Sequence, residues 1–130
     1  MNIALWILQI ALGIYFIGVG VTHLVLPEGL PETISWIYDL SDSAHYAAGT
    51  AEILGGLGLI LPSLTKIQPS LTVWAALGLI VIMVLAAFWH LGREEYQNVV
   101  QNVILGGLLG FVAYGRWRLI PIPPRNESAA

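Results

Sequence analysis

The feature that most limits how this chain folds is a set of four long apolar runs. They cover approximately residues 3–26, 44–61, 71–91 and 99–115, and the intervals between them are short and rich in polar residues, proline or glycine. Each run is close to the ~20 residues that an α-helix needs to cross a hydrocarbon layer ~30 Å thick. Helices joined by such short intervals must be antiparallel neighbours. The sequence therefore predicts an all-α integral membrane protein, folded as an antiparallel bundle of four transmembrane helices.

The composition supports one membrane domain and excludes several other classes of protein. Of the 130 residues, 57% are hydrophobic and only 10% are charged, far from the balance of a soluble domain. We expect a single four-helix transmembrane domain over residues 1–119 and a proline-rich polar tail over residues 120–130. The net charge of -3 and the lack of clustered Lys and Arg argue against nucleic acid binding. Because the chain has no cysteine, disulfides, thiolate metal sites and dithiol redox chemistry would have to come from a partner.

The basic residues predict which way the bundle lies in the membrane. Of the five Lys and Arg residues, only Arg93 lies in the first or third interval. The other four follow the second or fourth run: Lys66, Arg116, Arg118 and Arg125. Because short cytoplasmic segments retain Lys and Arg, we expect both termini on the cytoplasmic side of a bacterial-type inner (plasma) membrane.

The first interval has the pattern of a short amphipathic helix. Pro31 is a residue type favoured in the first turn of a helix, and it lies among apolar side chains with near-helical spacing. These side chains are Leu30, Ile34, Ile37 and Leu40. We expect this short helix to lie along the outer membrane interface.

Small residues predict where the helices approach one another closely. The fourth run contains Gly106 and Gly110, four residues apart, and the second run repeats Ala47, Ala51 and Gly55 at the same spacing. Such patterns let helix backbones meet in a membrane, where lipid tails remove the usual hydrophobic drive for association. We interpret them as packing within the chain, and a homodimer stays open.

Glu52 is the residue most indicative of function, because an ionisable group inside the bilayer costs at least ~2.5 kcal/mol and commonly marks a site. It lies near the middle of the second run, close to the expected midplane. It shares one helix face with His45, Gly49 and Gly56, which are three or four residues apart, and we expect that face to point inward. At this depth the carboxyl group is expected to be uncharged and to donate a hydrogen bond, unless a cation lies nearby. A hydrogen bond between helices, with no further role, is the equally open alternative.

Polar residues from the other runs are predicted to lie at the same, outer level of the bundle, because antiparallel helices bring alternate run ends together. The candidate ligand-binding residues are Glu52, His23, His90, His45, Arg93, Asn98, Gln101 and Asn102. The first run also carries a stripe that leaves room for a neighbour or ligand, formed by Gly13, Phe16, Gly20 and His23. The inner half shows no comparable set, so we expect any chemistry near the outer mouth. In the plainer alternative, water at the interface solvates His23 and His90, and Arg93 belongs to a hydrated turn with Glu94 and Glu95.

A metal site is not predicted. Three histidines and one buried glutamate could supply imidazole and carboxylate ligands, but no two of them have the paired spacing typical of zinc sites. No nucleophilic triad or phosphate-binding glycine loop has a candidate either, and catalytic residues stay unassigned.

Three segments together carry a resemblance to a known family. Residues 52–62 read Glu-Ile-Leu-Gly-Gly-Leu-Gly-Leu-Ile-Leu-Pro, which resembles the second-helix signature of DoxX-like membrane proteins. The third run, led by Pro69 and ending in His90 and a basic-acidic turn, is similar to that family too, as is Val-Ala-Tyr-Gly-Arg at residues 112–116. The family often has a lysine near the end of the first helix, where this chain has His23, which puts an ion pair with Glu52 in doubt.

The resemblance implies four transmembrane helices and redox work. The family's namesakes include a membrane subunit of thiosulfate:quinone oxidoreductase, and relatives are associated with oxidative-stress complexes. The wider family is functionally diverse, so the resemblance implies no single reaction.

The leading hypothesis is a small subunit or accessory protein of a membrane redox system. It would bind a quinone or similar lipophilic ligand in the outer half of the bundle, with Glu52 and a histidine on the ring oxygens. Phe16, Phe88 or Trp89 would flank the ring. If the protein is an enzyme, it is a quinone-linked oxidoreductase subunit, and since no intrinsic cofactor is evident, a membrane protein partner or a bound cofactor would have to move the electrons. The alternative is a non-catalytic scaffold or assembly factor that docks partner helices; transport of a small solute or proton is a third hypothesis.

Overall fold

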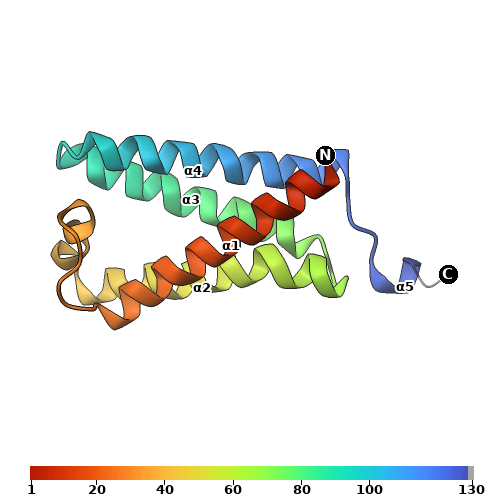
Figure 1. Ribbon diagram of the computed structural model, residues 1–130, viewed down its shortest axis with the longest axis horizontal. Coiled ribbons are helices and arrows are strands. Elements are labelled where there is room, and N and C mark those ends of the chain that lie inside the picture. Colours follow the sequence, from red (N-terminus) through yellow and green to blue (C-terminus); the bar gives the residue numbers. More distant parts are fainter. Residues whose placement is uncertain (129–130) are drawn as a thin grey trace.

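The computed structural model describes residues 1–128 and shows an antiparallel bundle of helices (Figure 1). The long helices are α1 (Asn2–Val25), α2 (Asp42–Thr65), α3 (Leu71–Gly92) and α4 (Tyr96–Tyr114), and α4 continues into one π-helical turn, η2 (Gly115–Leu119). Within the described residues, four helical spans are long and apolar enough to cross a membrane, and there is no strand. The predicted fold class is confirmed, and the chain is a multi-pass membrane protein.

The two ends of the bundle are built differently. One end, here called the η1 end, carries the 3₁₀-helix η1 (Glu32–Asp39) and the turn between α3 and α4 (Figure 1). The short helix predicted in the first interval is therefore present. The other end, here called the terminal end, carries the start of α1, the turn between α2 and α3, and the tail with the single helical turn α5 (Arg125–Ser128). The last two residues of the predicted tail, Ala129 and Ala130, lie outside the described residues.

Glycines set the contact between α1 and α2. A Cβ atom placed on Gly20 would lie 2.7 Å from the carbonyl oxygen of Gly49, and one on Gly49 would lie 2.8 Å from that of Gly20. Gly13 and Gly56 repeat this arrangement at 3.0 and 2.6 Å. No side chain larger than hydrogen fits between such close backbones. The two glycine-bearing stripes predicted from the sequence thus face each other.

The prediction that the glycines on α4 pack closely against another helix of the chain is wrong. Among the described atoms, nothing lies within 4 Å of a Cβ placed on Gly110, and Gly106 meets only Met83 Cβ at 4.0 Å. The groove predicted on α2 is used at Gly55, where the side chain of Leu79 packs at 2.6 Å from the Cβ position.

The start and end of α2 differ from the sequence prediction. Ser41 caps its first turn by accepting a hydrogen bond from the backbone N–H of Ala44 at 3.2 Å. The helix then continues through Pro62, which we had placed in the interval, and ends at Lys66 in the left-handed conformation with φ 59°. Proline is tolerated late in a membrane helix when the freed carbonyl lies in a well-packed bundle.

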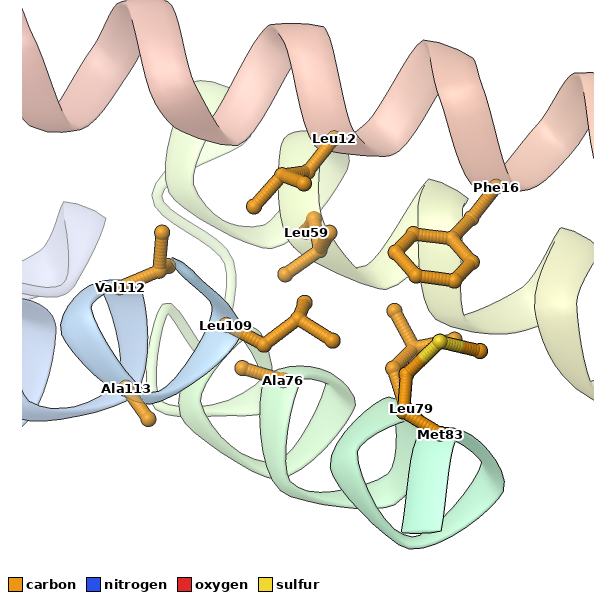
Figure 2. Packing of buried hydrophobic residues seen from close by; sticks show 9 residues of the cluster. All are labelled: Leu12, Phe16, Leu59, Ala76, Leu79, Met83, Leu109, Val112 and Ala113. Atoms are coloured by element: carbon orange, nitrogen blue, oxygen red, sulfur yellow. The ribbon is translucent and has the colours of Figure 1, made fainter. Parts of the chain in front are cut away.

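An apolar layer in the middle of the bundle receives side chains from all four helices (Figure 2). Its members are Leu12, Phe16, Leu59, Ala76, Leu79, Met83, Leu109, Val112 and Ala113. Along α1, this layer lies between Gln9 toward the terminal end and His23 toward the η1 end, and both of these polar side chains are buried. Buried polar groups at the two ends are thus separated by hydrocarbon.

Candidate functional site

A cavity of about 570 Å³ lies at the η1 end, among the long helices and beside η1. Its wall is mostly apolar and aromatic, with Phe16, Trp36, Met83 and Trp89 among the lining side chains. Six of the eight predicted site residues also line it: His23, Glu52, His90, Asn98, Gln101 and Asn102. The other two, His45 and Arg93, do not line the cavity. His45 contacts His23, which lines it, and Arg93 contacts Asp39 of η1. The topology therefore brings the predicted polar groups to one level.

Glu52 points into this space from the middle of α2. The residue is 4% exposed, and His23 Nε2 lies 3.7 Å from Glu52 Oε2, too far for a hydrogen bond. Oε2 has no hydrogen-bond partner within residues 1–128. Glu52 is held there because the glycines one turn away on each side, Gly49 and Gly56, let α1 pack against the same face.

His23 and His45 form a buried pair between α1 and α2. Their Nδ1 atoms lie 3.1 Å apart, so one Nδ1 carries a hydrogen and donates it to the other. Because His23 Nε2 faces Glu52, the three side chains make a row of exchangeable hydrogen sites leading from the cavity toward the start of α2. His45 is thus connected to the cavity through His23, which lines it.

A second polar network ties η1 to the turn between α3 and α4. His90 Nδ1 lies 2.8 Å from Glu95 Oε2, Arg93 Nε donates to Glu95 Oε1, and Arg93 Nη2 donates to Asp39 Oδ2 at 2.6 Å. Although partial burial on its own raises the pKa of Glu95, the hydrogen bonds from Arg93 and His90 hold it below its ordinary value. Arg93 therefore links Glu95 of this turn to Asp39 of η1 while it stays exposed, so the plainer interpretation as a hydrated turn stays a prediction.

η1 forms the cover of the cavity at this end, where Ile34, Trp36 and Ile37 line it. The ring of Trp36 lies edge-on to His90, with ring centres 4.6 Å apart, and 6.0 Å from Trp89. Its indole Nε1 is buried and has no hydrogen-bond partner among the described residues. We had not predicted Trp36 as a site residue, since its place over His90 depends on how the first interval folds back.

The amides of α4 close the side opposite Glu52. Gln101 Nε2 donates to the hydroxyl of Tyr15 at 3.0 Å, which joins α4 to α1. Asn102 lines the cavity, and its buried Nδ2 lacks a partner in the described part of the chain. Three buried polar atoms without partners therefore surround one cavity, on Glu52, Trp36 and Asn102. Each such atom costs ~1–3 kcal/mol when left unpaired, and a polar ligand relieves that cost.

Two predictions about the surroundings are wrong. Phe88 does not flank the cavity but is 68% exposed on the outside of α3, where lipid would contact it. The inner half, moreover, is not without polar groups. Its buried polar residues are Gln9, Ser63, Thr72 and Arg116.

Arg116 and Gln9 form the centre of that missed network. Arg116 Nε donates to Gln9 Oε1, and Arg116 Nη1 donates to Asn2 Oδ1 at 2.8 Å and to the carbonyl of Ile120 at 3.2 Å. Gln9 Nε2 in turn donates to the carbonyl of Leu59 at 2.8 Å. The signal in the sequence is Gln9, a lone amide inside a largely apolar first run.

Metal binding has no geometric support at this cavity. Over residues 1–128, no group of three or more His, Cys, Asp or Glu side chains is placed to hold a metal ion. The absence of a metal site stays a prediction.

Comparison with known proteins gives one match. A model of the DoxX-like family matches residues 7–112, which cover α2 and α3 completely, most of α1 and α4, and every residue that lines the cavity. No curated protein and no solved structure matches the chain.

Proposed function

The chain belongs to the DoxX-like family, and we propose that it binds a quinone or similar lipophilic redox molecule in the cavity at the η1 end, as a small subunit or accessory protein of a membrane redox system. One observation carries the proposal. Buried polar atoms of Glu52, Trp36 and Asn102 lack partners, and all three residues line a single, largely apolar cavity.

The chemistry of these groups suits a flat ring with oxygen atoms on opposite edges. Trp36 Nε1 is a hydrogen-bond donor only, and the Asn102 amide donates through Nδ2, so both favour carbonyl oxygens. Glu52 donates when protonated and accepts when ionised, which matches an oxygen that alternates between carbonyl and hydroxyl. The aromatic side chains of Phe16 and Trp89 supply an apolar wall.

Reduction of a quinone to a quinol takes two electrons and two protons. In our proposal, a partner protein delivers the electrons, and Glu52 with His23 and His45 delivers protons, because the two histidines are hydrogen-bonded and His23 Nε2 lies 3.7 Å from Glu52, a gap that the ligand or a small movement of the carboxyl group would close. The basic residues at the terminal end favour a cytoplasmic location for both termini, in a bacterial-type inner membrane. With this orientation, the row formed by Glu52, His23 and His45 would begin on the outer side of the membrane.

Replacement of Glu52 by Gln tests the proposal. The protein in lipid nanodiscs is titrated with decylubiquinone, and quenching of tryptophan fluorescence is followed, since Trp36 and Trp89 border the cavity. We expect saturable quenching for the parent protein and a roughly tenfold or larger loss of affinity for Glu52→Gln. Glu94→Gln, a change of the same chemistry in the exposed turn, is the matched control and should bind as the parent does. Equal binding by both variants would remove the proposal.

A second candidate function is docking of a partner transmembrane helix. It is favoured by the face of α4 at Gly106 and Gly110, where the described chain packs little or nothing against the glycines. Changing both glycines to Leu should release a partner that cross-links to α4 in native membranes, while Glu52→Gln leaves that cross-link intact. A cross-link between two copies of this chain would instead identify a homodimer.

A further inference from the structure

The terminal end holds a second pocket, of about 900 Å³, whose charged lining is basic. It lies between the turn that joins α2 to α3, the turn η2 and the tail. The basic residues that line it are Lys66, Arg116 and Arg125, and neutral polar side chains come from Gln68, Ser70 and Asn126. Among the side chains that the structure describes, no Asp or Glu lines it.

Arg116 is a buried cation that has no anionic partner among the side chains that the structure describes. The residue is 4% exposed, and its partners are all neutral: the side chains of Gln9 and Asn2, the carbonyl of Ile120 and the ring of Trp6, 5.1 Å away. Its Nη2 has no hydrogen-bond partner in residues 1–128, and no described carboxylate lies within ion-pair distance. Neutral hydrogen bonds compensate a buried charge incompletely, so an anion in the adjoining pocket would stabilise this arginine.

The backbone adds to the positive potential of the pocket. Helix α3 begins at this end, directly after Ser70, which makes no side-chain capping hydrogen bond. Its first turn contains no acidic residue, so the positive end of the helix dipole is uncompensated there. The tail closes the opposite side, since the backbone N–H of Arg125 donates to the carbonyl of Lys66 at 2.8 Å.

The surface around the pocket is suited to lipid. Trp74 and Trp117 are 67% and 58% exposed, and Ile67 and Leu71 are exposed beside them. Tryptophan is enriched where membrane proteins meet the headgroup layer. A basic pocket between helix ends at this level is a common form of headgroup site.

We propose that this pocket binds a phosphate group, and that in the membrane the group belongs to the headgroup of an anionic phospholipid. The phosphate oxygens accept hydrogen bonds from Lys66, from Ser70 and from the guanidinium of Arg116, and the acyl chains lie along the exposed side chains of α3. This site is separate from the cavity at the η1 end and does not depend on the quinone proposal.

Lipid retention measured by native mass spectrometry tests the proposal. The full chain is reconstituted in nanodiscs of equal parts phosphatidylglycerol and phosphatidylcholine, released, and its bound lipids are counted. We expect preferential retention of phosphatidylglycerol. Lys66→Gln should lower that preference about fivefold, since one cation near an anionic lipid contributes about that factor. Ser70→Asp should lower it as well, because the new carboxylate repels phosphate while it caps α3 and so preserves the fold.

Arg118→Gln is the matched control. Arg118 is basic and lies in the same turn as Arg116, but it packs on Trp117, at 4.2 Å from the ring centre, and does not line the pocket. This variant should retain phosphatidylglycerol as the parent does.

A second measurement separates lipid from a free ion. Inorganic phosphate is titrated against the protein in nanodiscs of pure phosphatidylcholine, with binding followed by calorimetry. Phosphate binding that Ser70→Asp abolishes, without any lipid preference, would keep the site but assign it to a free ion. If neither probe distinguishes Lys66→Gln and Ser70→Asp from Arg118→Gln, the proposal is overturned.

Discussion

The two ends of the bundle both bury polar side chains, yet they treat them differently. At the terminal end, Gln9 and Arg116 bond to each other and to backbone carbonyls, and Ser63 bonds to Thr72 at 2.7 Å, so that among the described side chains there only Arg116 Nη2 is buried without a partner. At the η1 end, polar atoms around the cavity stay unpaired, Glu52 Oε2 among them. Polar groups that satisfy one another hold helices together, whereas groups left unpaired around a cavity are more useful to a ligand than to the fold. By this criterion Gln9, Ser63 and Thr72 stabilise the fold, whereas Glu52 Oε2 at one end and Arg116 Nη2 at the other are candidate functional groups.

Removal of Gln9 at the terminal end should destabilise the protein more than replacement of Glu52 at the η1 end. Gln9→Leu deletes the bond to Leu59 and takes a partner from the buried charge of Arg116. Hydrogen bonds to charged groups contribute about 1.5–3 kcal/mol, so we expect a loss of stability of about 2–3 kcal/mol. Glu52→Gln, at the other end, should change stability by less than about 1 kcal/mol, because Oε2 has no described partner to lose. Unfolding in SDS from mixed micelles measures both, and equal losses would contradict the distinction.

Glycines at the two ends differ in what a new methyl group would meet. Gly49→Ala places a methyl group 2.8 Å from the carbonyl oxygen of Gly20, and backbone cannot easily move away, so we expect a loss of about 1–3 kcal/mol. Gly115→Ala at the terminal end meets the Leu5 side chain, with Cδ2 at 2.6 Å and Cγ at 3.3 Å, and a side chain can shift more readily than a backbone carbonyl. Its loss should be below about 1 kcal/mol. The same SDS unfolding assay checks the order, and a larger loss for Gly115→Ala would show that the α1–α2 contact is not rigid.

Much of the fold follows from local pattern alone. Span length and short intervals fix four antiparallel helices, and three- and four-residue spacing places Glu52 and His23 inside the bundle. Those inferences succeed because they need only helix geometry and topology. The error at Pro62 shows the limit, since whether a helix continues past a proline depends on its neighbours.

The site itself was predicted less completely. The spacing of side chains on one helix does not say which helix lies opposite, so the unused face at Gly110 was not foreseen. Trp36 reaches His90 only because η1 folds over the cavity mouth. Arg116 was interpreted as a marker of topology, because a basic residue after the last span usually faces water, yet here it is buried.

A smaller effect is expected for the hydrogen bond between Ser63 and Thr72 at the terminal end. Ser63 and Thr72 bond across the turn between α2 and α3, at 2.7 Å. In a double-mutant cycle of Ser63→Ala and Thr72→Val, we expect a coupling energy of ~0.6 kcal/mol, the average for such bonds in membranes. Unfolding of the four proteins in SDS provides the cycle. A coupling near zero would mean that this pair does not help to hold the terminal end.

The smallest effect on stability concerns the cover of the cavity, and it depends on pH. The pKa of Glu95 is held below its ordinary value of 4.5, so its contribution to the folded state is present above that value and is lost as pH falls through the folded pKa. Protonation weakens the bonds from Arg93 and His90, and with them the link through Asp39 to η1. Because Trp36 sits on η1 beside His90, we expect its fluorescence to change as the pH is lowered from about 7 to about 3.

Glu95→Gln separates this carboxylate from other groups near the mouth that titrate. The variant cannot lose a charge at position 95, so a fluorescence change that belongs to Glu95 should be absent from it. Asp39→Asn keeps Glu95 but weakens the link to η1, so the cavity should be open more often at every pH. We therefore expect decylubiquinone to quench Trp36 faster in this variant than in the parent protein. If Glu95→Gln follows the same pH curve as the parent protein, the mouth is closed by the packing of Trp36 against His90 and Trp89, and the polar network is incidental to it.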